Sequence, residues 1–252
     1  MIVSKIQNTA IPVVRTLPAD LETTISVYLK LAGEGPSFLL ESVTGGEQVA
    51  RYSFIGVDVQ TAWVLRADAW ERHTAEGTLT RHPLAGRAPL QVLQTLWQPC
   101  LPLPHPDLPR FVGGLVGYLG YETVRYLEPT VALAPDAALP EAVFLEPAAV
   151  VAFDHARDRL LMIALAADED VIPAAEARLD ALQSRLRQPL PPLPHASVLE
   201  QAELQAHTTR ADFLAAVETA REHIAAGDIF QVVLSQRFSR RTAAHPFAIY
   251  RA

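Results

Sequence analysis

Two apolar runs joined by a short polar segment constrain the fold of this chain more than any other feature. Residues 142–153 and 160–166 are mainly apolar, and residues 154–158 between them carry two aspartates, a histidine and an arginine. Apolar runs of this length around turn residues predict two strands joined as a hairpin. A second hairpin is predicted where residues 38–42 and 49–55 flank a turn with two glycines. Because a hairpin pairs its strands in opposite directions, the sequence predicts antiparallel sheet.

Helical patterns lie among these strands without regular alternation. One helix is predicted to be capped by Asp20, with a buried face made of Leu21, Ile25, Tyr28, Leu29 and Ala32. Pro89 suits the first position of another helix, and two more strands are expected at 61–66 and 70–75. Hairpins with scattered helices favour an α+β fold of mixed, largely antiparallel sheets with flanking helices over a doubly wound parallel sheet.

Charge and cysteine content argue against several classes of protein. The chain has 252 residues and a formal net charge of −7, without the clusters of Lys and Arg that bind nucleic acid phosphates. The single cysteine, Cys100, cannot form an internal disulfide or a Cys-based zinc site, which fits a reducing compartment. No signal peptide and no apolar run of membrane-spanning length is visible. We therefore expect a cytoplasmic protein that binds neither nucleic acid nor a membrane.

A proline-rich segment predicts a domain boundary near residue 190. It contains Pro189, Pro191, Pro192 and Pro194. We expect an amino-terminal domain over 1–188, a linker over 189–208 and a second region over 209–252. In that region Thr209 and Asp212 predict the start of a helix that Gly227 ends. Residues 229–238 then alternate and predict a strand whose core-facing side chains are Phe230, Val232, Leu234 and Phe238.

The residues alone show no catalytic constellation and no metal-binding spacing of His or Cys. The glycine-rich stretch 111–121 lacks the spacing of a phosphate-binding loop, and it predicts a bulged strand or close backbone contact.

The second hairpin could bind a zwitterion. Glu41, Ser42 and Arg51 place an acid, a hydroxyl and a base on two strands that are expected to pair. A site for an amino acid needs an anion, a cation and orienting hydroxyls beside an apolar wall. The same pattern fits a cross-strand salt bridge between Glu41 and Arg51, which contributes little if it is exposed. Taken alone, these residues favour the salt bridge.

Several segments resemble anthranilate synthase component I. Gly-Asp-Ile-Phe-Gln-Val-Val-Leu-Ser-Gln-Arg-Phe at 227–238 is similar to the segment that opens the chorismate-binding half of that family. Leu-Leu-Glu-Ser-Val-x-Gly-Gly-Glu at 39–47, followed by Arg-Tyr-Ser-Phe-Ile-Gly at 51–56, resembles its allosteric tryptophan-binding segment. Residues 111–118 and 153–155 are also similar to family segments, so the resemblance runs from about Leu17 to Arg251.

The resemblance implies a function and a regulatory site. The family converts chorismate and ammonia, which a glutamine amidotransferase partner (component II) supplies, to anthranilate and pyruvate in tryptophan biosynthesis. It uses Mg²⁺ and is feedback-inhibited by tryptophan. Leu40, Glu41 and Ser42 match the positions that contact the inhibitor, and Arg51 matches a basic position in the same pocket.

The resemblance also implies that this chain is the amino-terminal portion of a longer enzyme, with a fold that is incomplete at its C-terminus. Residues 1–188 then form the regulatory, tryptophan-binding domain, and 209–252 begin a truncated catalytic domain. The catalytic residues and Mg²⁺ ligands of the family lie beyond the equivalent of Ala252, so we expect the isolated chain to be inactive. One alternative is aminodeoxychorismate synthase component I, which typically has Asn at the position of Val233. Another is a non-catalytic tryptophan-binding or assembly module.

Overall fold

The computed structural model describes residues 9–42, 51–128, 130, 131, 133, 138–193 and 203–252. The chain divides into two compact units, Met1–Pro191 and Pro192–Ala252. The division falls inside the proline-rich segment.

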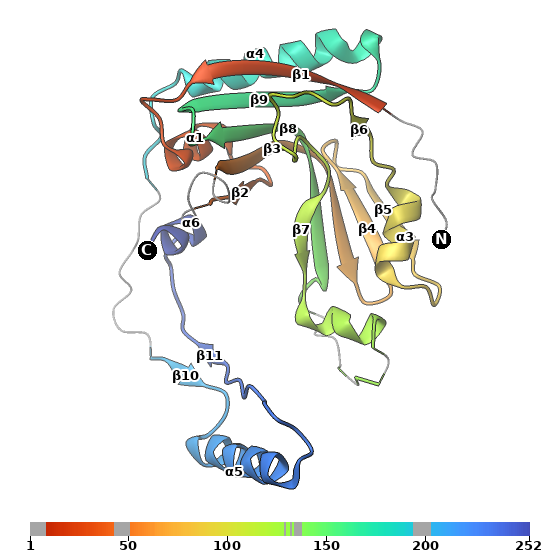
Figure 1. The fold of residues 1–252 in the computed structure, drawn as a ribbon, viewed down its shortest axis with the longest axis vertical. Coiled ribbons are helices and arrows are strands. Elements are labelled where there is room, and N and C mark those ends of the chain that lie inside the picture. The colour runs from red at the N-terminus through yellow and green to blue at the C-terminus, as the bar shows by residue number, and fades with distance from the viewer. Residues whose placement is uncertain (1–8, 43–50, 129, 132, 134–137, 194–202) are drawn as a thin grey trace. The chain divides into compact units, whose positions relative to one another are not determined.

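The first unit is built on a nine-stranded sheet (Figure 1). Its main path runs in the order β5 (Leu79–Pro83), β4 (Ala69–Thr74), β3 (Tyr52–Arg66), β8 (Ala142–Asp154), β9 (Arg159–Ala166), β1 (Thr9–Pro18) and β6 (Leu101–Pro102). Off this path, β2 (Phe38–Leu40) pairs with β3, and β7 (Val116–Leu119) pairs with β8. Among the described residues of this sheet, every pairing is antiparallel except that of β1 with β6. The predicted α+β fold with largely antiparallel sheet is confirmed.

Both predicted hairpins are present, although the second is longer than predicted. β8 and β9 form the first, with Asp154 opposite Arg159. In the second, β2 pairs with β3, and its turn lies outside the described residues. The predicted strands at 49–55 and 61–66 are one continuous strand, because β8 pairs with both halves of β3 across a register shift between Val59 and Thr61.

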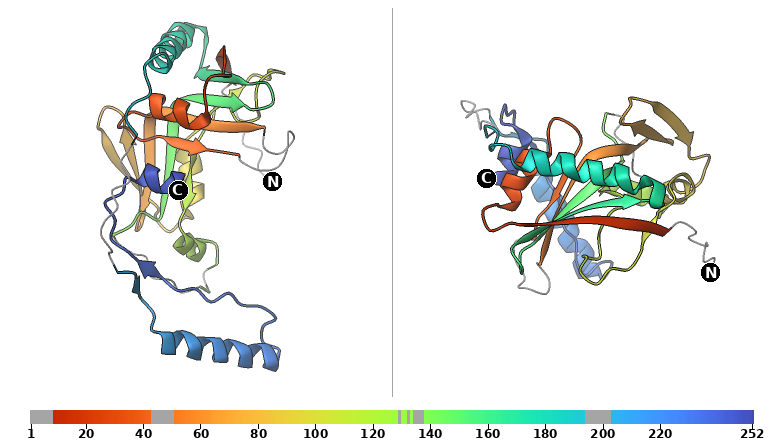
Figure 2. Two further views of the ribbon diagram at one scale, coloured as in Figure 1. Left: turned by 90° about the vertical axis from the view of Figure 1, so that its left-hand side faces the viewer. Right: turned by 90° about the horizontal axis from the view of Figure 1, so that it is seen from above.

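Three hydrophobic cores hold the elements of this unit together. Helices α1 (Thr24–Leu31) and α4 (Ile172–Leu186) cover one face of the sheet, and α4 lies along β1 and β9 (Figure 2). Helix α3 (Pro89–Leu96) packs on β3 and β4, where the Trp70 indole donates a hydrogen bond to the Pro89 carbonyl over 2.8 Å. The third core includes Val112, Leu161 and Ile163. The described part of the unit also contains two short 3-10 helices, η1 (Tyr121–Tyr126) and η2 (Glu169–Val171).

The start and the buried face of α1 differ from the prediction. Thr23 caps this helix in a capping box with Ser26, whereas Asp20 lies before it in a turn in which the Glu22 N–H donates to the Ala19 carbonyl. The buried residues of the helix are Thr24, Val27 and Leu31, and Leu21 is 93% exposed. The reciprocal bonds between Thr23 and Ser26 satisfy two backbone N–H groups locally, and so set the helix start three residues later.

The second unit contains α5 (Arg210–Ala226), α6 (Pro246–Arg251) and the paired strands β10 (Gln205–Ala206) and β11 (Phe238–Ser239). The predicted ends of α5 are confirmed, since the Thr209 side chain accepts a hydrogen bond from the Asp212 N–H and Gly227 has a left-handed φ of 82°. The predicted strand over 229–238 is wrong, because only its last residue lies in a strand. A strand needs a neighbour for its backbone hydrogen bonds, and in the described part of the chain β10 pairs with Phe238 and Ser239 alone.

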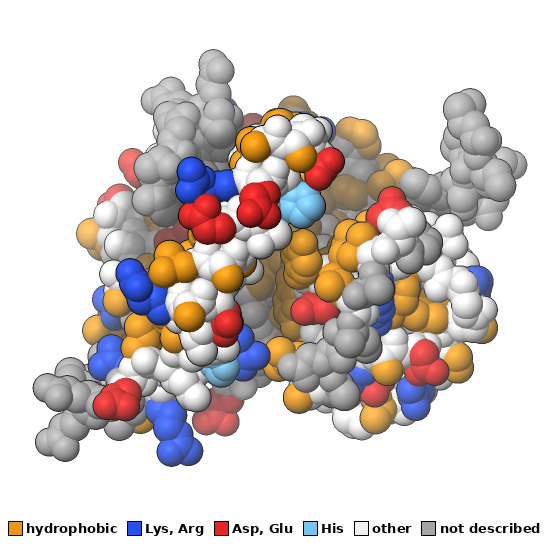
Figure 3. Space-filling view, turned by 90° about the horizontal axis from the view of Figure 1, so that it is seen from below, with side chains coloured by type: hydrophobic (Ala, Val, Ile, Leu, Met, Phe, Trp, Pro, Cys, Tyr) orange, Lys and Arg blue, Asp and Glu red, His pale blue; other side chains and the backbone are white. Residues whose placement is uncertain are grey.

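Large apolar side chains remain exposed in both units. Tyr121 and Leu127 of the first unit are 81% and 74% exposed, and Phe230 of the second is 94% exposed. Apolar side chains are visible between charged ones in the space-filling view (Figure 3). The described structure thus leaves several of its own apolar residues uncovered.

Candidate functional site

The hairpin of β2 and β3 is held in place by aromatic packing. Phe38 of β2 lies opposite Gly56 of β3, and a Cβ atom at Gly56 would come 2.0 Å from the Phe38 ring. The absence of a side chain there lets the ring lie directly on the β3 backbone. Phe111 packs near Phe38, at 6.5 Å between ring centroids, and edge-on to Phe54 at 5.3 Å. These contacts set the position of the residues that follow β2.

The four residues implicated by the sequence lie at this hairpin. Leu40 is the last residue of β2 and is exposed, while Glu41 and Ser42 follow it directly and are half-buried. Arg51 directly precedes β3 and is also half-buried. An apolar side chain, a carboxylate, a hydroxyl and a guanidinium therefore lie at or next to the end of β2 and the start of β3.

Ser53 connects this hairpin to the end of β8. Its side chain is 1% exposed, and its Oγ accepts a hydrogen bond from the Ser42 backbone N–H over 3.2 Å. The same oxygen lies 2.8 Å from Nε2 of His155. The imidazole of His155 stacks on the ring of Phe153. The backbone N–H of His155 donates a hydrogen bond to the Arg51 carbonyl over 2.9 Å. The Ser42 backbone is thus tied to a buried hydroxyl whose own position is fixed from β8.

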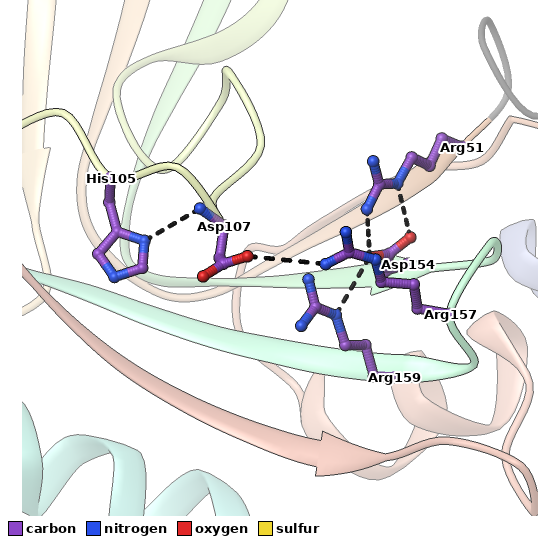
Figure 4. Close-up of polar contacts among 6 residues, drawn as sticks. All are labelled: Arg51, His105, Asp107, Asp154, Arg157 and Arg159. Carbon is purple, nitrogen blue, oxygen red and sulfur yellow. Dashed lines mark hydrogen bonds and ion pairs between the residues drawn. The ribbon is translucent and has the colours of Figure 1, made fainter.

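Arg51 forms a bidentate ion pair with Asp154, the last residue of β8 (Figure 4). Nε and Nη2 of Arg51 each donate to one carboxylate oxygen over 2.8 Å. Arg159 of β9 donates a third hydrogen bond, from Nε, over 3.2 Å. The Asp154 side chain is fully buried, whereas those of Arg51 and Arg159 are 31% and 20% exposed. Such fork-to-fork geometry is the strongest form of ion pair between side chains.

The two arginines determine the protonation of Asp154. Burial by itself would raise the pKa of this carboxyl group, but the hydrogen bonds from Arg51 and Arg159 outweigh burial and hold its pKa below the usual value. The bond to Asp154 in turn raises the pKa of Arg51 further above its ordinary range. Asp154 is therefore an anion at neutral pH, and Arg51 is held with Nε and Nη2 directed toward it.

A more exposed pair lies beside this cluster. Arg157 is 3.7 Å from the Asp107 carboxylate, and the Asp107 backbone N–H donates to Nδ1 of His105 over 3.2 Å (Figure 4). The Arg157 and Asp107 side chains are both more than half exposed. Pairs with this exposure and separation contribute about 0–1 kcal/mol to stability. The Arg51–Asp154 pair is therefore the one that organises the cluster.

Sequence reasoning missed Ser53, Asp154 and His155 as parts of this site. The sequence places Asp154 and His155 in a hairpin turn and suggests Glu41 as the ion-pair partner of Arg51, whereas the structure pairs Arg51 with Asp154. The available signal was the position of Asp154 at the end of a long apolar run, where a carboxylate is buried and needs a cation.

Neither a metal cluster nor a membrane span is found in the parts of the chain that the structure describes. No group of three or more His, Cys, Asp and Glu side chains in the described ranges could hold a metal ion. No described residue is assigned to the Mg²⁺ that the family resemblance implies. Within the same ranges, no helix combines the length and apolar character needed to cross a bilayer.

Comparisons with known proteins agree with the resemblance seen in the sequence. The chain is 43% identical over 243 residues to anthranilate synthase component 1 of Thermus thermophilus. The aligned region covers 96% of this chain and 50% of that protein. It is 40% identical to anthranilate synthase component 1 of Pseudomonas aeruginosa, over 93% of this chain and 49% of that protein. The crystal structure of anthranilate synthase component I from Streptococcus pneumoniae matches with a TM-score of 0.64 and 27% identity, over 93% of this chain and 51% of that one.

The chain spans about half the length of the curated relatives that it matches. Residues 35–252 match the family model described as chorismate binding enzyme. Since that match includes both units and most of the chain, this protein belongs to the chorismate binding enzyme family.

Proposed function

We propose that this chain is the amino-terminal, regulatory portion of an anthranilate synthase component I. The complete enzyme would convert chorismate and ammonia to anthranilate and pyruvate, with Mg²⁺ and with ammonia from a glutamine amidotransferase partner. Identity of 43% over nearly the whole chain to a relative of that name supports this proposal. A biosynthetic role and a single cysteine, Cys100, support a cytoplasmic location.

Within this enzyme, the hairpin of β2 and β3 would bind L-tryptophan. The Glu41 carboxylate would receive the ammonium of the ligand, the Ser42 hydroxyl would orient it, and Leu40 would contact its ring. Arg51 uses Nε and one N–H of Nη2 for Asp154, so Nη1 and the other N–H of Nη2 could meet the ligand carboxylate.

One observation carries the assignment of the site: both ends of the hairpin are held by buried groups. Ser53 binds the Ser42 backbone, and Asp154 binds the Arg51 guanidinium. A site held in its binding geometry before the ligand arrives avoids part of the ordering cost of binding.

Replacing the Glu41 carboxylate tests this site. Glu41→Gln removes the counter-charge of the ligand ammonium, which costs about 2–5 kcal/mol when the pair is shielded from water. Tryptophan affinity should therefore fall by roughly thirtyfold or more, as measured by calorimetry on this chain joined to the half of the Thermus thermophilus relative that it does not match. Glu34→Gln is the matched control, because Glu34 is an exposed carboxylate in the loop before β2. Equal affinity of the Glu41→Gln and wild-type chains would return the hairpin to a purely structural role.

A chimera tests the activity of the whole enzyme. This chain would be joined to the half of the Thermus thermophilus relative that it does not match. With chorismate, ammonium and Mg²⁺, the chimera should produce fluorescent anthranilate and should be inhibited by tryptophan. The Glu41→Gln chimera should keep its turnover and lose that inhibition. A folded chimera without turnover would contradict the proposed reaction, and equal inhibition of both chimeras would contradict the site.

A further inference from the structure

A cavity of about 400 Å³ lies in the first unit and is lined in part by Gln60 and Thr61 of β3. Its wall includes Glu146, Pro147, Ala148 and Ala149 of β8. β3 pairs along nearly the whole of β8, so the other edge of β8 is shared by β7, which pairs with 142–145, and by β9, which pairs with 150–154. Residues 146–149 have no strand on that edge in the described structure, and β7 and β9 diverge there (Figure 1). The cavity thus opens onto an interruption of the sheet.

Hydrogen-bond donors surround this interruption. Arg178 of α4 lines the cavity, with Nη1 at 3.4 Å from the Ala148 carbonyl, and Arg72 of β4 lines it with its guanidinium 5.7 Å from the centre of the Trp63 ring. Three neutral polar side chains also contribute to the wall, namely Gln60, Thr61 and Gln98. Two guanidinium groups in one small cavity favour an anion, and the planar fork of arginine matches a carboxylate.

One acidic side chain, that of Glu146, lines the same cavity as these cations. Oε1 of Glu146 accepts a hydrogen bond from the Trp97 indole over 2.9 Å, and both residues line the cavity. A fixed carboxylate repels a ligand that carries dense negative charge, such as a polyphosphate. It attracts an ammonium or a hydroxyl group. The polar part of the cavity is therefore suited to a ligand with a carboxylate near such a donor.

The remaining wall is apolar and closely packed. Val112, Ile163 and Leu165 contribute to it. A Cβ atom at Gly113 would lie 2.8 Å from Cδ1 of Leu165, so the glycine lets its loop close against the sheet. A volume of about 400 Å³ falls within the range of roughly 300–1,000 Å³ that is usual for small-molecule sites.

We propose that this cavity binds a small organic acid with an ammonium or hydroxyl group next to its carboxylate. Arg178 and Arg72 bind the carboxylate, Glu146 accepts a hydrogen bond from the neighbouring donor, and Val112, Ile163 and Leu165 contact the aliphatic part. The site is distinct from the tryptophan site, since Leu40, Glu41, Ser42 and Arg51 do not line it.

Three isosteric acids test the chemistry of this site. L-Leucine, L-2-hydroxy-4-methylpentanoate and 4-methylpentanoate differ only in carrying an ammonium, a hydroxyl or a hydrogen next to the carboxylate. The chain has three tryptophans, so labelling them with ¹⁵N gives a small set of indole signals, and Trp97→Phe assigns the one at the cavity. We expect the first two acids to shift the Trp97 signal with dissociation constants in the millimolar range. 4-Methylpentanoate should bind about tenfold more weakly, because it lacks the donor for Glu146.

Two variants connect these shifts to the cavity. Arg178→Met should abolish the saturable shift of the Trp97 signal. Arg185→Met is the matched control on the same helix, because Arg185 pairs with Asp58 at 3.0 Å and does not line the cavity. Glu146→Gln should reduce the discrimination between L-leucine and 4-methylpentanoate. Thermal unfolding checks that each variant is folded. The proposal is overturned if none of the three acids shifts the Trp97 signal saturably, or if a folded Arg178→Met chain shows the wild-type response.

Discussion

At the scale of single residues, a buried carboxylate organises the candidate site. Asp154 is withdrawn from water, and three hydrogen bonds from Arg51 and Arg159 compensate for its charge. Removing one partner of a buried pair is much more destabilising than removing an exposed charge, because the remaining group stays buried without its counter-ion. Asp154 therefore contributes both to stability and to the placement of Arg51.

Neutralising Asp154 should destabilise the chain. Asp154→Asn leaves two guanidinium groups facing a neutral amide, and we expect a loss of about 3 kcal/mol in the free energy of unfolding near neutral pH. Urea unfolding measures this loss. Asp107→Asn is the control, since Asp107 forms an exposed pair with Arg157, and it should cost about 0–1 kcal/mol. Equal effects of the two substitutions would show that burial of Asp154 has no energetic role.

The same substitution should change the response to acid. The pKa of Asp154 is lowered in the folded state, so its stabilising contribution is fully present above the unfolded pKa of about 3.9 and is lost as the pH falls through the folded value. The difference in unfolding free energy between the wild-type and Asp154→Asn chains should therefore shrink below about pH 4. Urea titrations over an acid series measure it, and a difference independent of pH would contradict the assignment.

Ser42 should affect ligand binding rather than folding. Its backbone N–H is bonded to Ser53, and Ser42→Ala keeps that bond while removing the proposed contact of the hydroxyl with tryptophan. A hydrogen bond to a neutral or charged group contributes about 0.5–3 kcal/mol, so the affinity for tryptophan should fall by roughly several-fold to a hundredfold. Ser37→Ala is the control, because the Ser37 hydroxyl bonds to Tyr28. Calorimetry on both variants decides, and an unchanged affinity of Ser42→Ala would remove Ser42 from the site.

At the scale of secondary-structure elements, β7 depends on a glycine. A Cβ atom at Gly117 would lie 1.8 Å from the Val143 carbonyl oxygen, so β7 can lie at its observed distance from β8 only without a side chain there. The glycine-rich stretch 111–121 was predicted to allow close backbone contact, and this prediction is confirmed.

Gly117→Ala should therefore destabilise the edge of the sheet. Overpacking costs about 1–3 kcal/mol, and the neighbouring atoms here belong to a backbone that cannot rotate away. Gly35→Ala is the matched control, since no atom lies within 4 Å of a Cβ built there. Chemical denaturation compares the two variants, and a Gly117→Ala chain as stable as Gly35→Ala would mean that β7 can move away at no cost.

At the scale of the whole molecule, the two units differ in how much they bury. α4 of the first unit buries Ala175, Leu179, Leu182 and Leu186, whereas α5 of the second unit has no buried residue. The two helices have similar lengths of 15 and 17 residues. Tertiary packing supplies most of the stability of a helix in a protein. We therefore expect α4 to be more stable against local unfolding than α5.

Hydrogen exchange should reveal this difference. Amides of α5 should exchange through local opening, and those of α4 and of the β8–β9 pair should exchange only through larger unfolding events. Mass spectrometry on peptides from the two helices provides the comparison within one sample. Similar protection of the α4 and α5 amides from exchange would contradict the expected difference in stability.

Features that depend on neighbours in the sequence were determined by the sequence itself. Thr209 and Gly227 predict both ends of α5, and Pro89 predicts the start of α3, because caps and first-turn positions involve residues a few places apart. The hairpin of β8 and β9 follows in the same way from a short turn between two apolar runs. The Leu-Leu-Glu-Ser segment indicates the candidate site only through its resemblance to anthranilate synthase component I.

Only the tertiary structure decided which distant groups meet. Arg51 pairs with Asp154, 103 residues away, because the ladder between β3 and β8 brings their ends together. The apolar alternation of residues 229–238 predicts a strand. A strand also needs a neighbouring strand to pair with its backbone N–H and C=O groups. In the described part of the chain, Phe238 is the one residue of this segment that has such a neighbour. Periodicity is encoded within each segment, whereas pairing and burial depend on what the rest of the chain places beside it.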